Sequence, residues 1–149
     1  LAGYPVVGLA ADLYDGSYHD VDSNELSFKM AASLAYKAGL PLAKPVLLEP
    51  IGELKVTIPD SVVGAVMGDI NSKRRGTVLG SNPAEGKPGY TTIDAEVPKA
   101  TMVEYTIDLR AMTQGKGSYS FYFVRYDEVP GSEAQKIIAE AKANMSEED

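Results

Sequence analysis

The first third of the chain changes from a two-residue to a helical spacing of apolar positions. Apolar and polar positions alternate along Val6–Tyr14, which predicts a β-strand. From about Ser23 to Ala38 the spacing is helical, and Leu26, Met30 and Leu34 form one apolar stripe. The residues between these two elements are polar, so the pattern predicts a strand, a loop and a helix.

Capping and breaking residues set the expected ends of this helix. Asp22 and Glu25 have the spacing of a capping box, in which side chains satisfy unpaired amides of the first turn. Gly39 is the expected helix stop. The prolines of Leu40–Pro45 predict a stiff, non-helical connector, and we place a domain boundary there.

The remainder alternates between strand and helix patterns in the order β-α-β-β-α-β. This order predicts an α+β, ferredoxin-like sandwich with two helices on one face of an antiparallel sheet. The expected elements are a strand over Val46–Ile58 bent at Pro50, a helix from Asp60 or Ser61 to about Lys73, strands at Gly76–Gly80 and Tyr90–Val97 around a loop at Ser81–Gly89, a helix over Lys99–Met112, a strand at Ser118–Tyr126, and a last helix over Glu133–Asn144 ending in a frayed MSEED.

Apolar spacing also predicts which side chains form the core. In the helix after Asp60, the inward residues are expected to be Val63, Val66, Met67 and Ile70. In the final strand, Tyr119, Phe121 and Phe123 are expected to alternate inward. Such an aromatic strand could also be an RNA-stacking platform, but the accompanying basic and glycine pattern is missing, which favours core packing.

Composition excludes several kinds of site. The 149 residues include no cysteine and a single histidine, His19, which excludes disulfides, thiol nucleophiles and a histidine-rich metal site. No apolar run is long enough to cross a membrane, so no membrane partner is expected. The lack of cysteine fits a reducing cytosol, and we expect a cytoplasmic protein. The start LAGYPVV lacks a signal peptide or initiator Met and suggests a piece of a longer chain.

The charge distribution limits how nucleic acid could be bound. A net charge of −7 argues against bulk attraction to RNA. Residues 61–130 contain as many bases as acids and include the cluster Lys73-Arg74-Arg75. Any RNA contact must therefore come from local basic patches.

His19 is the most conspicuous candidate for a site. Asp20 and Asp22 lie close in sequence and could serve acid–base catalysis, but no nucleophile pattern accompanies them. A solvated loop histidine is the simpler alternative. A contact role fits better, because a strand-loop-helix tip presenting Tyr18 and His19 can stack on bases and bond to phosphate or ribose.

Two glycine-rich strings superficially resemble phosphate-binding loops. A P-loop needs GxxxxGK[ST] with a strand before it and a helix after it. Neither Gly86–Gly89 (GKPG) nor Gly115–Ser118 (GKGS) meets that requirement, and QGKGS joins a helix to a strand. Ordinary glycine turns are predicted at both places, and neither a nucleotide nor a metal is expected.

The basic residues near helix ends have two interpretations. Lys73, Arg74 and Arg75 end the first ferredoxin-like helix, where cations interact favourably with the helix dipole. They could equally contact a phosphate backbone, to which guanidinium groups are suited. Arg110 and Lys116, near the end of the second helix, have the same two interpretations.

Several strings, in one order, are similar to bacterial elongation factor G. They are GYPVV (3–7), DGSYHDVDSNELSFKMA (15–31), PVLLEPI (45–51), GDINSKRRGTVLG (68–80), AEVP (95–98), DLRAMTQGKGSY (108–119) and YDEVP (126–130). Met102–Tyr105 (MVEY) and the long hairpin loop around Ser81–Tyr90 depart from the family pattern. These departures fit a divergent elongation factor G-like paralogue.

The resemblance implies a domain organisation and a function. Residues 1–44 would be the second half of the family's fourth domain, 45–130 its ferredoxin-like fifth domain, and 131–149 a C-terminal helix and tail. The parent would be a ribosome-dependent GTPase of protein biosynthesis that uses GTP and Mg²⁺ to promote tRNA–mRNA translocation. The chain itself, without the GTP-binding domain, would be no enzyme and hold no cofactor.

The resemblance also implies which residues contact the ribosome. The fourth-domain tip reaches the decoding region, and the matching residues here are Gly16, Ser17, Tyr18, His19 and Asp20. The fifth domain faces large-subunit ribosomal RNA and the stalk base, for which the candidates are Lys73, Arg74, Arg75, Arg110 and Lys116. The alternatives are a ferredoxin-like regulatory or partner-binding module, since one fold serves many functions, and a ribosome-protection-type factor.

Overall fold

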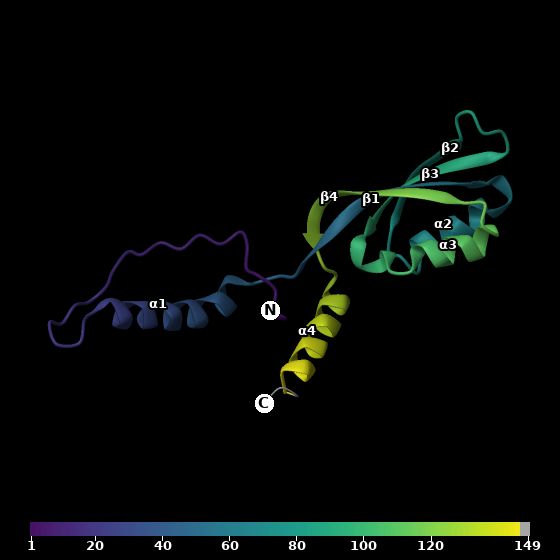
Figure 1. The fold of residues 1–149 in the computed structure, drawn as a ribbon. Helices are drawn as coiled ribbons and strands as arrows, with labels where there is room; N and C mark the ends of the chain where they lie inside the picture. Colours follow the sequence, from purple (N-terminus) through teal and green to yellow (C-terminus); the bar gives the residue numbers. More distant parts are fainter. Residues whose placement is uncertain (147–149) are drawn as a thin grey trace. The chain divides into compact units, whose positions relative to one another are not determined.

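The computed structural model describes residues 1–146, which fall into two compact units. One unit is Leu48–Glu128, and the other combines Leu1–Leu47 with the chain from Val129 onward. The elements of both units are labelled in Figure 1.

The Leu48–Glu128 unit has the predicted β-α-β-β-α-β order. Its four strands pair antiparallel in the spatial order β2-β3-β1-β4, which is the ferredoxin-like arrangement (Figure 1). The elements are β1 (Leu48–Pro59), α2 (Val63–Asn71), β2 (Thr77–Pro83), β3 (Tyr90–Pro98), α3 (Tyr105–Thr113) and β4 (Ser118–Glu128).

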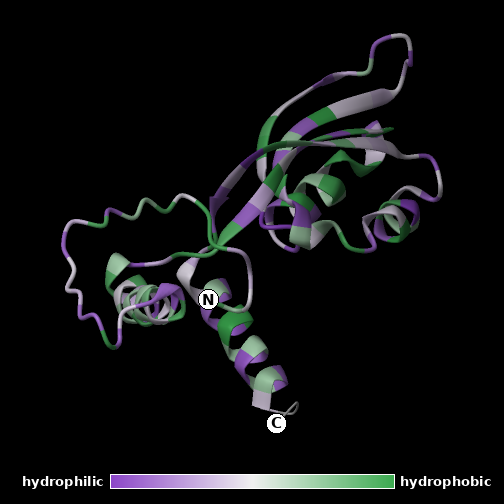
Figure 2. Ribbon diagram, turned by 60° about the vertical axis from the view of Figure 1, so that its left-hand side comes forward, coloured by the Kyte–Doolittle hydropathy of each residue, from purple (hydrophilic) through white to green (hydrophobic). Residues whose placement is uncertain are grey.

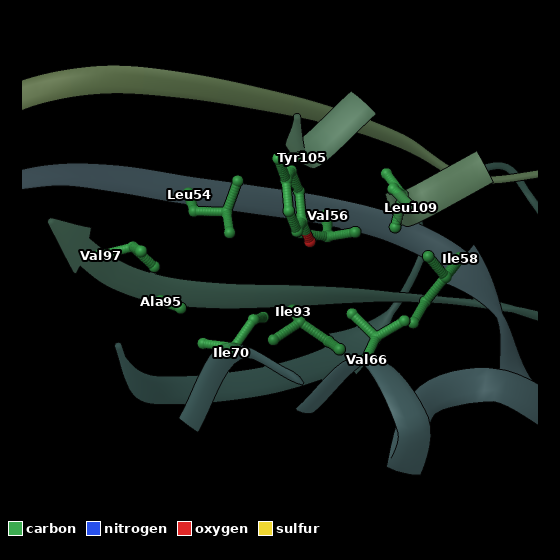
Figure 3. Close-up of a cluster of buried hydrophobic side chains, with 10 residues drawn as sticks. All are labelled: Leu54, Val56, Ile58, Val66, Ile70, Ile93, Ala95, Val97, Tyr105 and Leu109. Carbon is green, nitrogen blue, oxygen red and sulfur yellow. The ribbon is translucent and has the colours of Figure 1, made fainter. Parts of the chain in front are cut away.

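The core lies between one face of this sheet and the two helices. Most strand residues alternate between buried and more exposed positions. Hydrophobic and hydrophilic residues are interspersed along the strands (Figure 2). Full burial of each large apolar side chain contributes about 1.5–3 kcal/mol. The central cluster is Leu54, Val56, Ile58, Val66, Ile70, Ile93, Ala95, Val97, Tyr105 and Leu109 (Figure 3). The inward positions predicted in α2 are confirmed, since Val63 and Met67 pack against this cluster.

Both helices of this unit begin later than predicted. A 3-10 turn at Asp60–Val62 precedes α2, and the Asp60 carboxylate accepts a hydrogen bond from the Thr91 hydroxyl (2.6 Å) instead of capping the helix. The single helix predicted over Lys99–Met112 is wrong. A 3-10 turn at Lys99–Met102 is separated from α3 by Glu104, which adopts φ 62°.

The aromatic strand β4 is only partly inward-facing. Phe121 packs against the core, as predicted, and Tyr119 meets Tyr105 edge to face at 4.9 Å between ring centroids. Phe123 is 60% exposed, so its predicted burial is wrong. It lies opposite Gly52, beside the register shift between Ile51 and Gly52.

The helix of the other unit starts at a different cap from the one predicted. In α1 (Glu25–Gly39), the Asn24 side chain accepts a hydrogen bond from the Ser27 amide (2.9 Å). The predicted Asp22–Glu25 capping box does not form. Glu25 is paired instead with Lys29 one turn later (2.8 Å).

Two further expectations for this unit are wrong. The chain at Val6–Tyr14 forms no strand, because the described residues supply no neighbouring strand to which it could hydrogen-bond. Leu40–Ala43 is a 3-10 helix and not an extended connector, since Pro41 lies in its first turn, where a missing N–H costs little. α1 does end at Gly39, as expected, although Gly39 keeps a right-handed conformation, and Lys44 takes the left-handed conformation that ends the 3-10 helix.

The last helix, α4, covers Gly131–Ser146 and is longer than predicted. Its first turn is tied to the preceding residue, because the Ala134 amide donates to the Pro130 carbonyl (2.9 Å). Met145 and Ser146, expected to fray, are helical. The rest of the predicted tail, residues 147–149, lies outside the described residues.

Candidate functional site

The loop Asp15–Asp22 is exposed along its whole length and immediately precedes α1 (Figure 1). At its start the Asp15 carboxylate accepts a hydrogen bond from the Gly16 amide (2.8 Å), and a turn follows at Asp20–Asp22. All five predicted tip residues, Gly16, Ser17, Tyr18, His19 and Asp20, lie in this loop with their side chains open to solvent. The loop can therefore present these groups to a partner.

His19 is held through its main chain, which leaves its imidazole available. Its amide donates to the Ser23 hydroxyl oxygen (2.8 Å), and its carbonyl accepts from the Ser23 amide (2.9 Å) and the Asp22 amide (3.3 Å). Among the described residues, no hydrogen bond or ion pair engages the imidazole. The loop thus fixes the backbone of His19 and leaves the ring free to bind.

Tyr18 connects the loop to the helix. Its ring stacks on that of Phe28 with centroids 6.5 Å apart and an interplanar angle of 16°. Phe28 lies in the first turns of α1, which Asn24 caps. The tip is consequently attached to a defined helix start at two places, Tyr18 and His19.

The three basic residues after α2 have different environments. The Lys73 ammonium group is bound to Asp108 (2.6 Å), and its side chain remains 61% exposed. The Arg75 guanidinium makes a two-pronged contact with the buried Glu49 (3.2 and 3.0 Å). Arg74 is 2% exposed and points into the protein.

Arg74 is the centre of a buried polar cluster. Its guanidinium lies 5.0 Å from the centroid of the Tyr105 ring, a favourable cation–π arrangement. A buried cation is tolerated only when its charge and its N–H groups are satisfied. Here its partners are the carboxylates of Asp69 and Asp108 and the carbonyl oxygens of Thr101 and Val103.

The cluster changes the titration of two neighbours. The hydrogen bond from Lys73, reinforced by Arg74, lowers the pKa of the Asp108 carboxyl. Burial, together with the negative charge of Asp69, raises the pKa of the Tyr105 hydroxyl. Asp108 is therefore held as a carboxylate while Tyr105 stays neutral.

Arg110 and Lys116 are exposed near the end of α3. No ion pair involves either side chain within residues 1–146. Between them, Gln114 and Gly115 take positive φ values (51° and 79°) and reverse the chain into β4. This is the predicted glycine turn, and it leaves both cations free to reach a phosphate.

The GKGS segment does not have the structural setting of a P-loop. The GKGS segment follows α3 and precedes β4, the reverse of the strand-then-helix order that lets a P-loop hold phosphate. Across residues 1–146, no three carboxylate or histidine groups come together as a metal site would require.

Sequence reasoning missed the distinction among the three adjacent basic residues. Arg74 and Arg75 looked equivalent, yet each has a carboxylate partner that is distant in sequence, Asp108 and Glu49. The hint in the sequence, for Arg74 alone, was that residues 61–130 contain as many acidic as basic residues. The Ser23 contacts were also missed.

Two family models match the chain. Elongation factor G, domain IV, matches residues 1–44, and the elongation factor G C-terminus matches residues 46–137. The chain belongs to the elongation factor G family. Part of domain IV is followed by the family's C-terminal domain, and neither matched region is the GTP-binding domain.

A solved structure supports the same assignment. The chain is similar to a crystal structure of a protein from Thermus thermophilus, with 46% sequence identity and a TM-score of 0.69. The similarity covers 87% of this chain and 19% of the Thermus chain, so this elongation factor G segment spans about a fifth of the length of that protein. No helix among residues 1–146 is both long and apolar enough to cross a membrane.

Proposed function

We propose that this chain is the ribosome-contacting C-terminal region of a translational GTPase that promotes tRNA–mRNA translocation. Its membership in the elongation factor G family supports the assignment. The single observation that carries it is the exposed Asp15–Asp22 loop at the start of α1, in the part that matches domain IV. A module that bound only a small molecule would not require such a tip.

The proposed role of the tip is to contact RNA at the decoding region. Tyr18 offers an aromatic face, and the His19 imidazole offers a donor and an acceptor that suit phosphate or ribose. Gly16 and Ser17 add small residues that allow close approach of a backbone. We assign His19 a contact role and not a catalytic one, because no nucleophile accompanies it.

The proposed second contact uses exposed basic residues of the C-terminal domain. Lys73, Arg110 and Lys116 can each reach a phosphate of large-subunit RNA near the stalk base. Arg75 can contribute from its half-buried position beside Glu49. Arg74 is enclosed, so its proposed role is to hold the segment that carries Lys73 and Arg75.

GTP and Mg²⁺ belong, in this proposal, to a GTP-binding domain elsewhere in the full-length protein. That domain would supply the energy of nucleotide hydrolysis, while the residues described here bind and position RNA. In this proposal, tRNA–mRNA translocation takes place on cytoplasmic ribosomes.

The test is His19→Ala in the full-length protein, with Gln135→Ala, an exposed polar position on α4, as matched control. We expect single-round translocation to slow several-fold or more while ribosome-stimulated GTP hydrolysis is retained. The control should leave both rates unchanged. If His19→Ala translocates at the wild-type rate, the tip role is wrong for this protein.

A further inference from the structure

Ser23 makes two hydrogen bonds to one residue, His19. The Ser23 hydroxyl oxygen accepts from the His19 amide (2.8 Å), and the Ser23 amide donates to the His19 carbonyl (2.9 Å). Both main-chain polar groups of His19 are therefore bound to a single residue four positions later. This pairing forms a ring that closes the loop at its tip.

The ring adjoins the capped start of α1. Ser23 directly precedes Asn24, whose side chain caps α1 by accepting from the Ser27 amide (2.9 Å). Fixing Ser23 at the helix start consequently fixes His19 as well. Ser23 is itself partly buried, whereas the tip residues before it are exposed.

We propose that Ser23 is a positioning residue for the tip, which fixes His19 so that its imidazole faces the RNA partner. This inference rests on the proposed function of the tip. A loop already in its bound conformation avoids the entropy cost of ordering on contact, so its binding is stronger and its geometry better defined. Ser23 need not touch the partner.

The chemistry of the position restricts which residues could do this. The hydroxyl oxygen must stand one carbon from the backbone to accept the His19 amide, which serine and threonine allow and alanine does not. The backbone bond from the Ser23 amide to the His19 carbonyl does not depend on the side chain. Ser23→Ala therefore loses the hydrogen bond from the His19 amide to the side chain and keeps the backbone bond. Ser23→Thr keeps both hydrogen bonds.

The positioning role can be measured in this chain without any ribosome, by solvent exchange of amide protons in NMR spectra. In Ser23→Ala we expect the His19 amide to exchange about fivefold faster or more, the factor expected when a hydrogen bond of ordinary net strength is lost. Ser23→Thr should retain the slow exchange. Ser33→Ala, at an exposed serine on α1, is the control and should change nothing at His19. Unchanged His19 exchange in Ser23→Ala overturns the proposal, whatever the tip does on the ribosome.

The functional half of the test is a double-mutant comparison in the full-length protein. Ser23→Ala should slow translocation several-fold, Ser23→Thr should restore it, and Ser23→Ala should add no slowing once His19 is alanine. Equal slowing with and without His19 would mean that Ser23 acts on general loop stability, which contradicts a positioning role. If His19→Ala alone has no effect while the exchange result holds, the proposed function of the tip fails and the hydrogen-bonded ring stands.

Discussion

At the scale of single residues, the adjacent cations Lys73 and Arg74 have different environments, because only Arg74 is buried. Arg74 is enclosed by two carboxylates and two carbonyls, whereas Lys73 keeps most of its side chain in solvent. A guanidinium group suits the enclosed position because its planar fork can satisfy several acceptors at once. Arg74 thus stabilises the fold, and Lys73 remains available for a partner.

Replacing Arg74 should destabilise the protein far more than replacing its neighbour. Arg74→Ala leaves the Asp69 and Asp108 carboxylates and two carbonyl groups without their shared cation. We expect a loss of about 3 kcal/mol in the free energy of unfolding, as for other broken buried pairs. Lys73→Ala, which removes an exposed ion pair, should cost less than about 1 kcal/mol. Urea denaturation measures the free energy of unfolding of both variants. Equal losses in Arg74→Ala and Lys73→Ala would contradict the structural role of Arg74.

The lowered pKa of Asp108 predicts a dependence of stability on pH. Because Lys73 and Arg74 favour its carboxylate, the stabilisation is complete above the ordinary value of 3.8 and is lost as the pH falls through the lower folded-state pKa. Asp108→Asn should therefore lower the urea midpoint at pH 6. The difference from wild type should shrink at pH 3 or below. A difference that is constant with pH would show that the carboxylate charge contributes nothing.

At the scale of elements, α1 differs from α2 and α3 because none of its residues is buried in the described structure. Its helical state therefore depends on local terms: the Asn24 cap, the Glu25–Lys29 pair and intrinsic propensity. The helices of the sheet unit are held by core packing instead, so they tolerate starts without a side-chain cap.

Removing the cap of α1 should fray its first turn. Asn24→Ala deletes the acceptor for the Ser27 amide, at a cost of about 1 kcal/mol. Hydrogen exchange of the amides at the helix start should accelerate by roughly a factor of five. Asn24→Asp keeps an acceptor and should preserve protection. If the alanine variant exchanges like wild type, the helix is stabilised by something other than this cap.

The sequence predicted the elements in which one apolar periodicity dominates. It did not predict helix ends where several adjacent residues could each act as the cap. The strands β1 and β3 were expected at Val46–Ile58 and Tyr90–Val97, and the structure has strands at both places. Near the start of α1, Asp22, Ser23 and Asn24 are all good capping residues, and only the backbone geometry decides among them. The break at Glu104 could not be predicted from the local sequence. Glu104 has a positive φ, and the carbonyl of its neighbour Val103 accepts a hydrogen bond from Arg74, which is distant in sequence.

At the scale of the whole molecule, the predictable part of the candidate site was the exposure of the loop Asp15–Asp22. An exposed polar loop between two patterned segments follows from sequence alone, and the ordered strings added the family. The strand expected at Val6–Tyr14 could not be judged in this way, since a strand depends on a partner that its own pattern does not reveal. The interior position of Arg74 likewise depends on Asp108, which lies on α3, far from Arg74 in the sequence.

The central claim is that the Asp15–Asp22 loop contacts RNA at the decoding region, and directed cleavage tests it most directly. The chain has no cysteine, so Ser17→Cys places a single thiol in the loop, to which an iron chelate can be attached. Gln135→Cys on α4 serves as the control, and both are tested in the full-length protein freed of any other cysteine. Bound to ribosomes, the Ser17 probe should cleave small-subunit RNA at the decoding region, and the Gln135 probe should not. Absence of that cleavage from position 17, in a protein that still binds ribosomes and hydrolyses GTP, would contradict the claim.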